Sequence, residues 1–345
     1  DRLYITTSVD PAAAEFQAYD ISNVSADILT LTGSVELGET SNGFALGNEY
    51  AYVLTNGNSS EIAVVRLSDL TIVATWDIPS DSDPNDIAID EAAGRAYVVT
   101  DNSVDDEFYI LNISSPAVAS IQIVDQGEIS ANALSVDYYS GYGYVGTDTA
   151  GSELVIITLS DPNTIATCNL TGAAALNELS IKGTSLFVGH AGGGASEFTE
   201  YSINPAAPND CLYITGNVIG GTNLGTDDVT GMHIDTVQGY AFISIASATD
   251  ELQVIDLATF VASPLDLTGS FCDAVTFLGG FIYAGCRDNT ATLQVIEGAK
   301  EGAWAQLQLV GDGDVLSGNP SGISVAATDN AIFLGTDINN IGEEF

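Results

Sequence analysis

Ala96-Tyr97-Val98-Val99-Thr100 decides the fold, because close variants of this segment recur along the whole chain. Each variant has small or apolar residues, then one aromatic ring, then an apolar tail that often ends in threonine. The eight copies begin at Leu3, Ala51, Ala96, Gly143, Leu186, Ala241, Ile282 and Ile332. Self-similarity at a spacing of about 40 to 50 residues indicates one supersecondary unit that has been copied, so that neighbouring copies bury each other's faces.

A second segment follows the aromatic segment and fixes the period. It is a continuous apolar run, such as Ile62 to Leu67 or Leu154 to Leu159, and it is rich in β-branched residues. The runs start at Phe16, Ile62, Phe108 and Leu154, each 46 residues after the one before, and then at Phe198, Leu252 and Leu293. Runs of this length, bounded by Gly, Asp, Asn, Ser and Pro, are typical of strands buried on both faces.

Two further short stretches complete each copy, one before the aromatic segment, as in Asp86 to Asp90, and one after the apolar run, as in Thr71 to Ile78. Four-stranded antiparallel sheets of this kind are the blades of a β-propeller, in which each sheet is buried between its neighbours. The sequence therefore predicts an all-β fold, a single β-propeller domain over residues 1–345. We expect seven four-stranded blades, with eight as the alternative. A two-sheet sandwich fits less well, because its strands would alternate more strictly between apolar and polar residues.

The repeats have a family resemblance. Leu154 to Pro162 and Leu252 to Asp256 resemble the repeats of LVIVD-repeat propellers, and the Tyr-Val-Thr strands are similar to those of the YVTN family of surface propellers. The resemblance covers essentially the whole chain and implies a propeller of a surface protein. Phe198 to Tyr201 and the insertion from Pro205 to Asp228 depart from the pattern. The shared motifs specify a blade and not a reaction.

The C-terminal segment holds one strand more than seven blades need. Ile323 to Ala326 is expected to join the sheet begun at Leu3 and so to close seven blades, yet Ile332 to Thr336 repeats the aromatic segment once more. This surplus half-blade has three explanations: an incomplete eighth blade, a trimmed chain end, or a strand that pairs with another subunit. An apolar strand without a sheet is a template for pairing with a second chain. Residues 330–345 are therefore a candidate strand-exchange or blade-closing segment, with Ile332, Phe333, Leu334 and Phe345 as the self-association residues in the first case.

The charge of the chain excludes one class of partner. Its 47 acidic and 6 basic residues give a formal net charge of -41 at pH 7, which repels nucleic acid and anionic lipid. An extracellular location, a salt-rich habitat or cation binding would each fit such a surface. No run of 18 or more apolar residues occurs, so we expect no membrane span in this chain.

The four cysteines predict two disulfides. Cys272 and Cys286 flank a hairpin that turns at Gly279-Gly280, which places them opposite or nearly opposite on adjacent antiparallel strands. Cys168 and Cys211 fall at like positions in the expected fourth strands of consecutive copies, so they could join neighbouring blades. Two disulfides would indicate an oxidising compartment, hence an extracellular or cell-surface location. Four buried thiols are the alternative.

Catalytic motifs are missing from the sequence. Neither histidine, His190 or His233, belongs to a metal-binding cluster, and the chain has no nucleophile elbow or phosphate loop. We therefore assign no catalytic residue. The enzyme alternative is a lactonase-like hydrolase or lyase that uses His233, Asp235, loop carboxylates and a divalent metal.

Calcium is the one cofactor the sequence suggests. Asp81, Asp83 and Asn85 alternate as calcium-loop ligands do, although Pro84 and Asp86 depart from the usual loop. The other acidic loops hold Asp101, Asp105, Asp106 and Glu107, and Asp312 and Asp314. Solvated turn carboxylates, with no cofactor at all, are the alternative. The acceptor pattern for N-glycosylation occurs at Asn23, Asn58, Asn112 and Asn169.

These observations favour a non-enzymatic extracellular propeller with a structural or adhesive role. Its partners would be copies of itself or other surface proteins, assembled into a filament or array by strand exchange. The enzyme above and a module that binds glycans or proteins are the two alternatives.

Overall fold

The structure is a computed structural model. It describes residues 2–7, 14–22, 30–57, 59–79, 83–101, 106–118, 122–170, 175–193, 196–267, 271–286 and 293–297, and the backbone of 308–313, 320–328 and 331–338.

The chain folds as an all-β, seven-bladed β-propeller, as the repeat predicts. Four sheets in chain order are β4 (Ser41–Leu46), β5 (Tyr50–Thr55), β6 (Ile62–Arg66) and β7 (Thr71–Trp76); β8 (Pro84–Asp90), β9 (Arg95–Thr100), β10 (Phe108–Asn112) and β11 (Ile123–Gly127); β12 (Ala133–Tyr139), β13 (Tyr142–Thr147), β14 (Leu154–Thr158) and β15 (Ile165–Cys168); and β16 (Leu176–Lys182), β17 (Ser185–His190), β18 (Phe198–Ser202) and β19 (Val218–Thr222).

The other three sheets come from the rest of the chain. They are β20 (Val229–Asp235), β21 (Tyr240–Ile245), β22 (Leu252–Asp256) and β23 (Val261–Leu265); β24 (Cys272–Leu278), β25 (Phe281–Cys286), β26 (Leu293–Glu297) and β27 (Gln308–Gly313); and, in spatial order, β28 (Pro320–Thr328), β29 (Ala331–Ile338), β1 (Arg2–Thr7), β2 (Phe16–Asp20) and β3 (Thr30–Val35). Helix α1 (Cys211–Gly216) lies between β18 and β19 in chain order.

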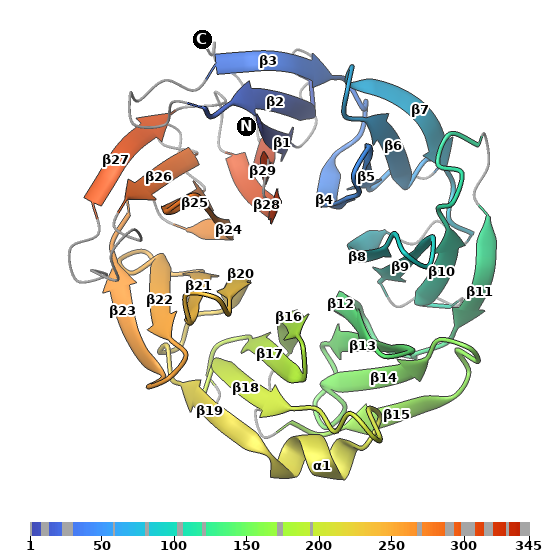
Figure 1. Ribbon diagram of the computed structural model, residues 1–345, viewed down its shortest axis with the longest axis vertical. Coiled ribbons are helices and arrows are strands. Elements are labelled where there is room, and N and C mark those ends of the chain that lie inside the picture. The colour runs from blue at the N-terminus through green and yellow to red at the C-terminus, as the bar shows by residue number, and fades with distance from the viewer. Residues whose placement is uncertain are drawn as a thin grey trace. The chain divides into compact units, whose positions relative to one another are not determined.

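The chain divides into two compact units. The first holds Asp1–Phe44, Arg66–Ile72 and Thr230–Phe345, and the second holds Ala45–Val65 and Val73–Val229. Within the second unit, the sheets that begin with β8, β12 and β16 follow one another, and these three first strands lie side by side (Figure 1).

Burial on both faces explains why the third strand of each sheet was readable from sequence. All seven apolar runs start at the residues predicted, and in β6, β10 and β14 the first four residues are buried. The aromatic segments are the second strands, and their rings pack in the core. Tyr97 and Phe108 stack with ring centroids 6.3 Å apart, and Phe187 and Phe198 with centroids 6.2 Å apart. Such pairs add about 0.5–1.5 kcal/mol beyond the area they bury.

The surplus strand corrects one expectation. β29 lies between β28 and β1, antiparallel to β28 and parallel to β1, so that Ile332 faces Leu3 and Phe333 faces Tyr4. It is a fifth strand of the first sheet and not the start of an eighth blade. When β29 is left out of the count, β28, β1, β2 and β3 are the first to fourth strands of this sheet, and we number them so. Both edges of β29 are hydrogen-bonded within the chain, so residues 331–338 are not an unpaired strand and instead close the first sheet, as the blade-closing alternative predicts. The segment that contains Ile323 to Ala326 joins the sheet begun at Leu3 as expected, but through β29. Phe345 lies outside the described residues.

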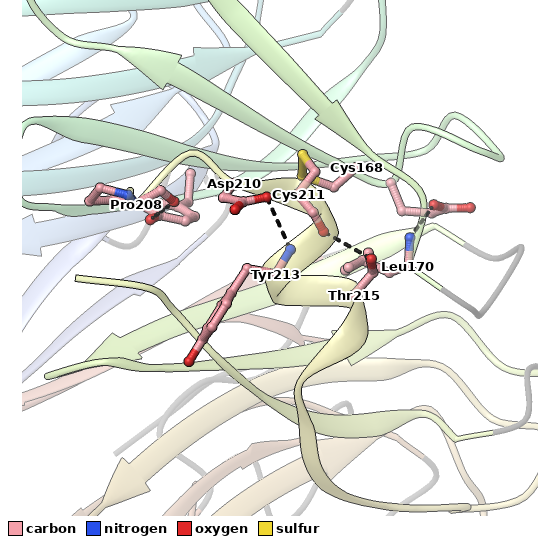
Figure 2. Close-up of a disulfide and its surroundings, with 9 residues drawn as sticks. Cys168, Leu170, Pro208, Asp210, Cys211, Tyr213 and Thr215 are labelled. Atoms are coloured by element: carbon pink, nitrogen blue, oxygen red, sulfur yellow. Dashed lines mark hydrogen bonds between the residues drawn. A yellow bond between two sulfur atoms is a disulfide. The ribbon is translucent and has the colours of Figure 1, made fainter. Parts of the chain in front are cut away.

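Both predicted disulfides form. Cys272 and Cys286 are directly opposite on β24 and β25, with Cα atoms 3.7 Å apart. Cys168 and Cys211 have Cα atoms 5.1 Å apart, and they link β15 to the connection between β18 and β19 of the next sheet. Cys211 is not on a fourth strand, however. It begins helix α1, whose first turn is capped by Asp210 accepting from the Tyr213 amide (Figure 2). The part of the chain that the structure describes contains no helix long and apolar enough to span a membrane.

Candidate functional site

The first strands of four sheets share a β-bulge near their start. In β8, β12, β16 and β24 the register against the second strand shifts after the first residue. As a result, Asp86, Ser135, Glu178 and Ala274 take equivalent places in their sheets. Bulges re-aim side chains and are over-represented beside functional sites. The polar side chains around these bulges are therefore the candidate site.

Two carboxylates on these strands bind the backbone of the next sheet. Asp86 accepts hydrogen bonds from the Ile87 amide and, through Oδ2, from the Val136 amide on β12 at 2.8 Å. Asp137 does the same one sheet further on, where its Oδ2 accepts from the Ile181 amide at 2.7 Å. These bonds fasten β8 to β12 and β12 to β16.

A third carboxyl group, Glu178, lies on β16. We call Asp86, Asp137 and Glu178 the acidic row; each residue is half-buried. Burial raises the pKa of Asp86 to about 6 and also raises that of Asp137. Burial, followed by the charge of Asp86, raises the pKa of Glu178 well above its ordinary value. A carboxyl pair with separated pKa values can act as an acid and a base at the same pH.

In the first unit, a histidine lies between two neighbouring sheets. His233 Nδ1 on β20 lies 3.2 Å from the Thr276 hydroxyl on β24, and its ring packs near Phe242 and Phe277. Asp235, its expected partner in the enzyme alternative, accepts from the Val237 and Gln238 amides and so shapes the turn after β20. His190 is buried at the end of β17.

The expected calcium ligands are only partly described. Asp81 lies outside the described residues. Asn85 donates to the Asp101 carboxylate at 2.8 Å and to the Ala133 carbonyl at 2.9 Å. The pKa of Asp83 is raised by burial and then by the charge of Asp101.

The remaining acidic loops give no fuller set of ligands. Asp106 accepts from the Gln126 side chain, Asp105 and Asp314 lie outside the described residues, and Asp312 is described in its backbone only. Among the described residues no group of three or more His, Cys, Asp and Glu side chains is placed to hold a metal ion.

Two of the four candidate glycosylation sites are described. Asn112 is the partly buried last residue of β10, and its side-chain oxygen accepts from the Ser114 amide. Asn169 is exposed directly after β15. Asn23 and Asn58 lie outside the described residues.

Six buried glutamates are the residues that sequence reasoning missed. Each immediately precedes a third strand and is at most 1% exposed: Glu15, Glu61, Glu107, Glu153, Glu197 and Glu251. Each carboxylate accepts from the amide of an apolar residue just past the fourth strand. These amides belong to Leu37, Ile78, Ile129, Leu170, Leu224 and Leu267, at N···O distances of 2.5 to 3.0 Å.

This finding corrects our alternative interpretation of Glu107 as a solvated turn carboxylate. The side chain is fully buried and holds the end of β11. The spacing of 46 residues from Glu15 to Glu61, Glu107 and Glu153 was a signal in the sequence that we did not use.

Comparison with known proteins shows a shared fold and does not show a family or an activity. No family model matches the chain, and no curated protein matches it. A periplasmic gluconolactonase of Pseudomonas aeruginosa, PpgL, is similar in structure with a TM-score of 0.71 and 12% identity, over 93% of this chain and 97% of that one.

Two further solved structures are similar over most of their length. A protein from Lactobacillus plantarum has a TM-score of 0.68 and 11% identity, over 97% of this chain and 99% of that one. The computationally designed protein Ika8 has a TM-score of 0.58 and 13% identity, over 96% of this chain and 92% of that one. At such identities the similarity shows a shared fold, since one propeller fold serves many functions.

Proposed function

We propose that this chain is a non-catalytic extracellular propeller with a structural or adhesive role, whose partners are copies of itself or other surface proteins. The observation that carries the proposal is that several fourth strands expose apolar side chains. β3, β11, β19 and β23 each stand last in the strand order of their sheet. They expose apolar side chains: Leu31 by 51%, Val124 by 49%, Val218 by 50%, Ile219 by 52% and Val261 by 61%. An edge strand with exposed apolar side chains can pair with another chain.

Two other features support the proposal. Both disulfides fit an oxidising compartment. The side chains of Asp86 and Asp137 are engaged with the backbone of the next sheet, which suits a rigid scaffold. The resemblance of the repeats to those of the LVIVD and YVTN surface propellers also supports the proposal.

A pair of lysines on one edge tests the proposal. We expect Val218→Lys with Ile219→Lys on β19 to abolish self-association or attachment to surfaces, because lysines on an edge strand block pairing. The matched control is Val237→Lys with Gln238→Lys, which adds the same charge in the exposed turn after β20. Sedimentation velocity and electron microscopy report association. Isolated 35.7 kDa wild-type particles that bind no surface would contradict the proposal, as would equal behaviour of the two variants.

A lactonase-like hydrolase or lyase is the second candidate. It is favoured by the acidic row, where Glu178, with its raised pKa, interacts with the charge of Asp86 and by the fold shared with a gluconolactonase. If the chain hydrolyses lactones, the Glu178→Gln variant should lose lactone turnover, whereas the Asp235→Asn variant should keep it. Binding of glycans or proteins without self-association would instead favour the third alternative, a binding module.

A further inference from the structure

The six buried glutamates have a second partner position in common. The residue just before each apolar amide donor directly follows the fourth strand, so it is equivalent in six sheets. It is acidic in four of them and asparagine in the other two: Glu36, Asp77, Glu128 and Asp266, against Asn169 and Asn223. All six of these side chains are exposed. We call the four acidic ones the partner acids of Glu15, Glu61, Glu107 and Glu251.

The hydrogen bonding of these four glutamates is incomplete as long as they are ionised. Their Oε2 atoms accept backbone amides, whereas the Oε1 atoms of Glu15, Glu61, Glu107 and Glu251 are buried without a hydrogen-bond donor in the described structure. A buried acceptor without a donor costs about 1–3 kcal/mol, and more when it is charged. A proton on Oε1 would turn that atom into a donor, and the partner acid would accept from it.

We propose that Glu15, Glu61, Glu107 and Glu251 are proton-holding clamps. In each, a neutral glutamic acid donates from Oε1 to its partner acid and accepts a backbone amide on Oε2, and loss of the proton loosens the end of the fourth strand. The fold is then stabilised in mildly acidic solution. In the other two sheets the partner position holds asparagine, which carries a donor group at any pH. Of these two glutamates, Glu153 accepts from the Gly151 amide on Oε1, whereas Glu197 Oε1 is buried without a hydrogen-bond donor, as in the clamps.

The charged groups around the clamps favour the protonated form. Burial raises the pKa of Glu15 to about 7, and the Glu36 carboxyl adds to the rise. Burial likewise raises the pKa of Glu61, Glu107 and Glu251, with further rises from Asp77, from Glu128, and from Asp266 and Asp250 respectively.

The direction of the pH effect follows from linkage. The folded chain keeps these protons at pH values where the unfolded chain has released them. The free energy of unfolding therefore falls as the pH rises from the unfolded pKa, about 4.3, through the raised folded values.

Neutral substitutes for the partner acids test the clamps. The clamp variant carries Glu36→Gln, Asp77→Asn, Glu128→Gln and Asp266→Asn. The control removes four negative charges at exposed positions outside the six partner positions, with Glu39→Gln, Glu49→Gln, Asp125→Asn and Asp161→Asn. Thermal midpoints are measured from pH 5 to pH 8.

We expect the wild-type and control midpoints to fall by several degrees over this range, and the clamp variant to lose most of that fall, because its amides donate without a proton. Equal pH dependence in the clamp variant and the control would overturn the proposal. The proposal would also be overturned if calcium chloride raised the wild-type midpoint at pH 8 to its pH 5 value. A bound cation, and not a proton, would then join the carboxylates. Infrared absorption of wild-type carboxylic acid groups gives a check that needs no variant. It should decrease between pH 5 and pH 8, and a constant signal would contradict the clamps.

Discussion

At the scale of single residues, Glu107 shows how one side chain secures the end of a sheet. Its Oε2 accepts from the Ile129 amide at 2.7 Å and from the Ser130 amide at 2.9 Å. The main-chain oxygen of the same residue accepts from the Thr100 amide at the end of β9. One residue therefore joins the second, third and fourth strands of its sheet.

Glu107→Ala is expected to lower the free energy of unfolding by about 1–3 kcal/mol, because the two amides past β11 lose their acceptor. Glu107→Gln should cost less, since the amide oxygen of glutamine still accepts. Urea unfolding measures both variants, with exposed Glu39→Ala as the control. An equal loss in the Ala and Gln variants would show that the acceptor is not what matters.

Gly192 lies where the loop after β17 closely approaches the segment after β19. A Cβ atom built at Gly192 would overlap the carbonyl oxygen of Thr226, whereas one at Gly216 would meet nothing. We expect Gly192→Ala to destabilise the fold by about 1–3 kcal/mol, the usual cost of overpacking. Gly216→Ala, at the end of α1, should be neutral or stabilising. Thermal unfolding compares the two, and similar midpoints would contradict the close approach of the two segments.

At the scale of elements, the Cys168–Cys211 disulfide holds a helix that could not stand alone. Helix α1 has six residues, well below the length at which an isolated helix is stable in water. Figure 2 shows Cys168 and Cys211 joined beside α1, with the Thr215 hydroxyl donating to the Cys211 carbonyl. The link to β15 is what places this helix.

Replacing Cys168 and Cys211 by serine should lower the free energy of unfolding by about 4 kcal/mol, because this disulfide closes a loop of 43 residues. Replacing Cys272 and Cys286 by serine should lower it by about 3 kcal/mol, because that loop has 14 residues. Hydrogen exchange gives the sharper readout. The amides of α1 should lose protection in the first variant and keep it in the second. Unchanged protection of α1 in both would refute the role of the disulfide.

The same elements show where sequence reasoning succeeded and where it failed. The third strands were predictable because Ile62 to Val65 and its equivalents are apolar on both faces, a pattern that few other structures produce. Helix α1 was missed because six residues carry little periodicity and a tertiary bond places them. The strand at Ile332 was predicted, but an apolar pattern does not say which neighbour a strand selects. The buried glutamates were missed because an acidic residue beside a turn is usually solvated.

At the scale of the whole molecule, the excess of acidic residues adds to the effect of the clamps. The described ion pair between Arg66 and Asp69 compensates one carboxylate, but the chain has 47 acidic and 6 basic residues. Mutual repulsion of so many charges destabilises the compact state. Stability should therefore fall with rising pH for two reasons, surface repulsion and loss of clamp protons.

Salt separates the two contributions. Screening shortens the range of surface interactions to about 3 Å at 1 M ionic strength and acts much less on buried pairs. We expect 1 M sodium chloride to raise the thermal midpoint at pH 8, and to leave a residual fall between pH 5 and pH 8 that the clamp variant lacks. A midpoint independent of pH in high salt would attribute the whole dependence to surface charge. Because Glu15, Glu61, Glu107 and Glu251 are at most 1% exposed, the residual fall is the outcome that their burial requires.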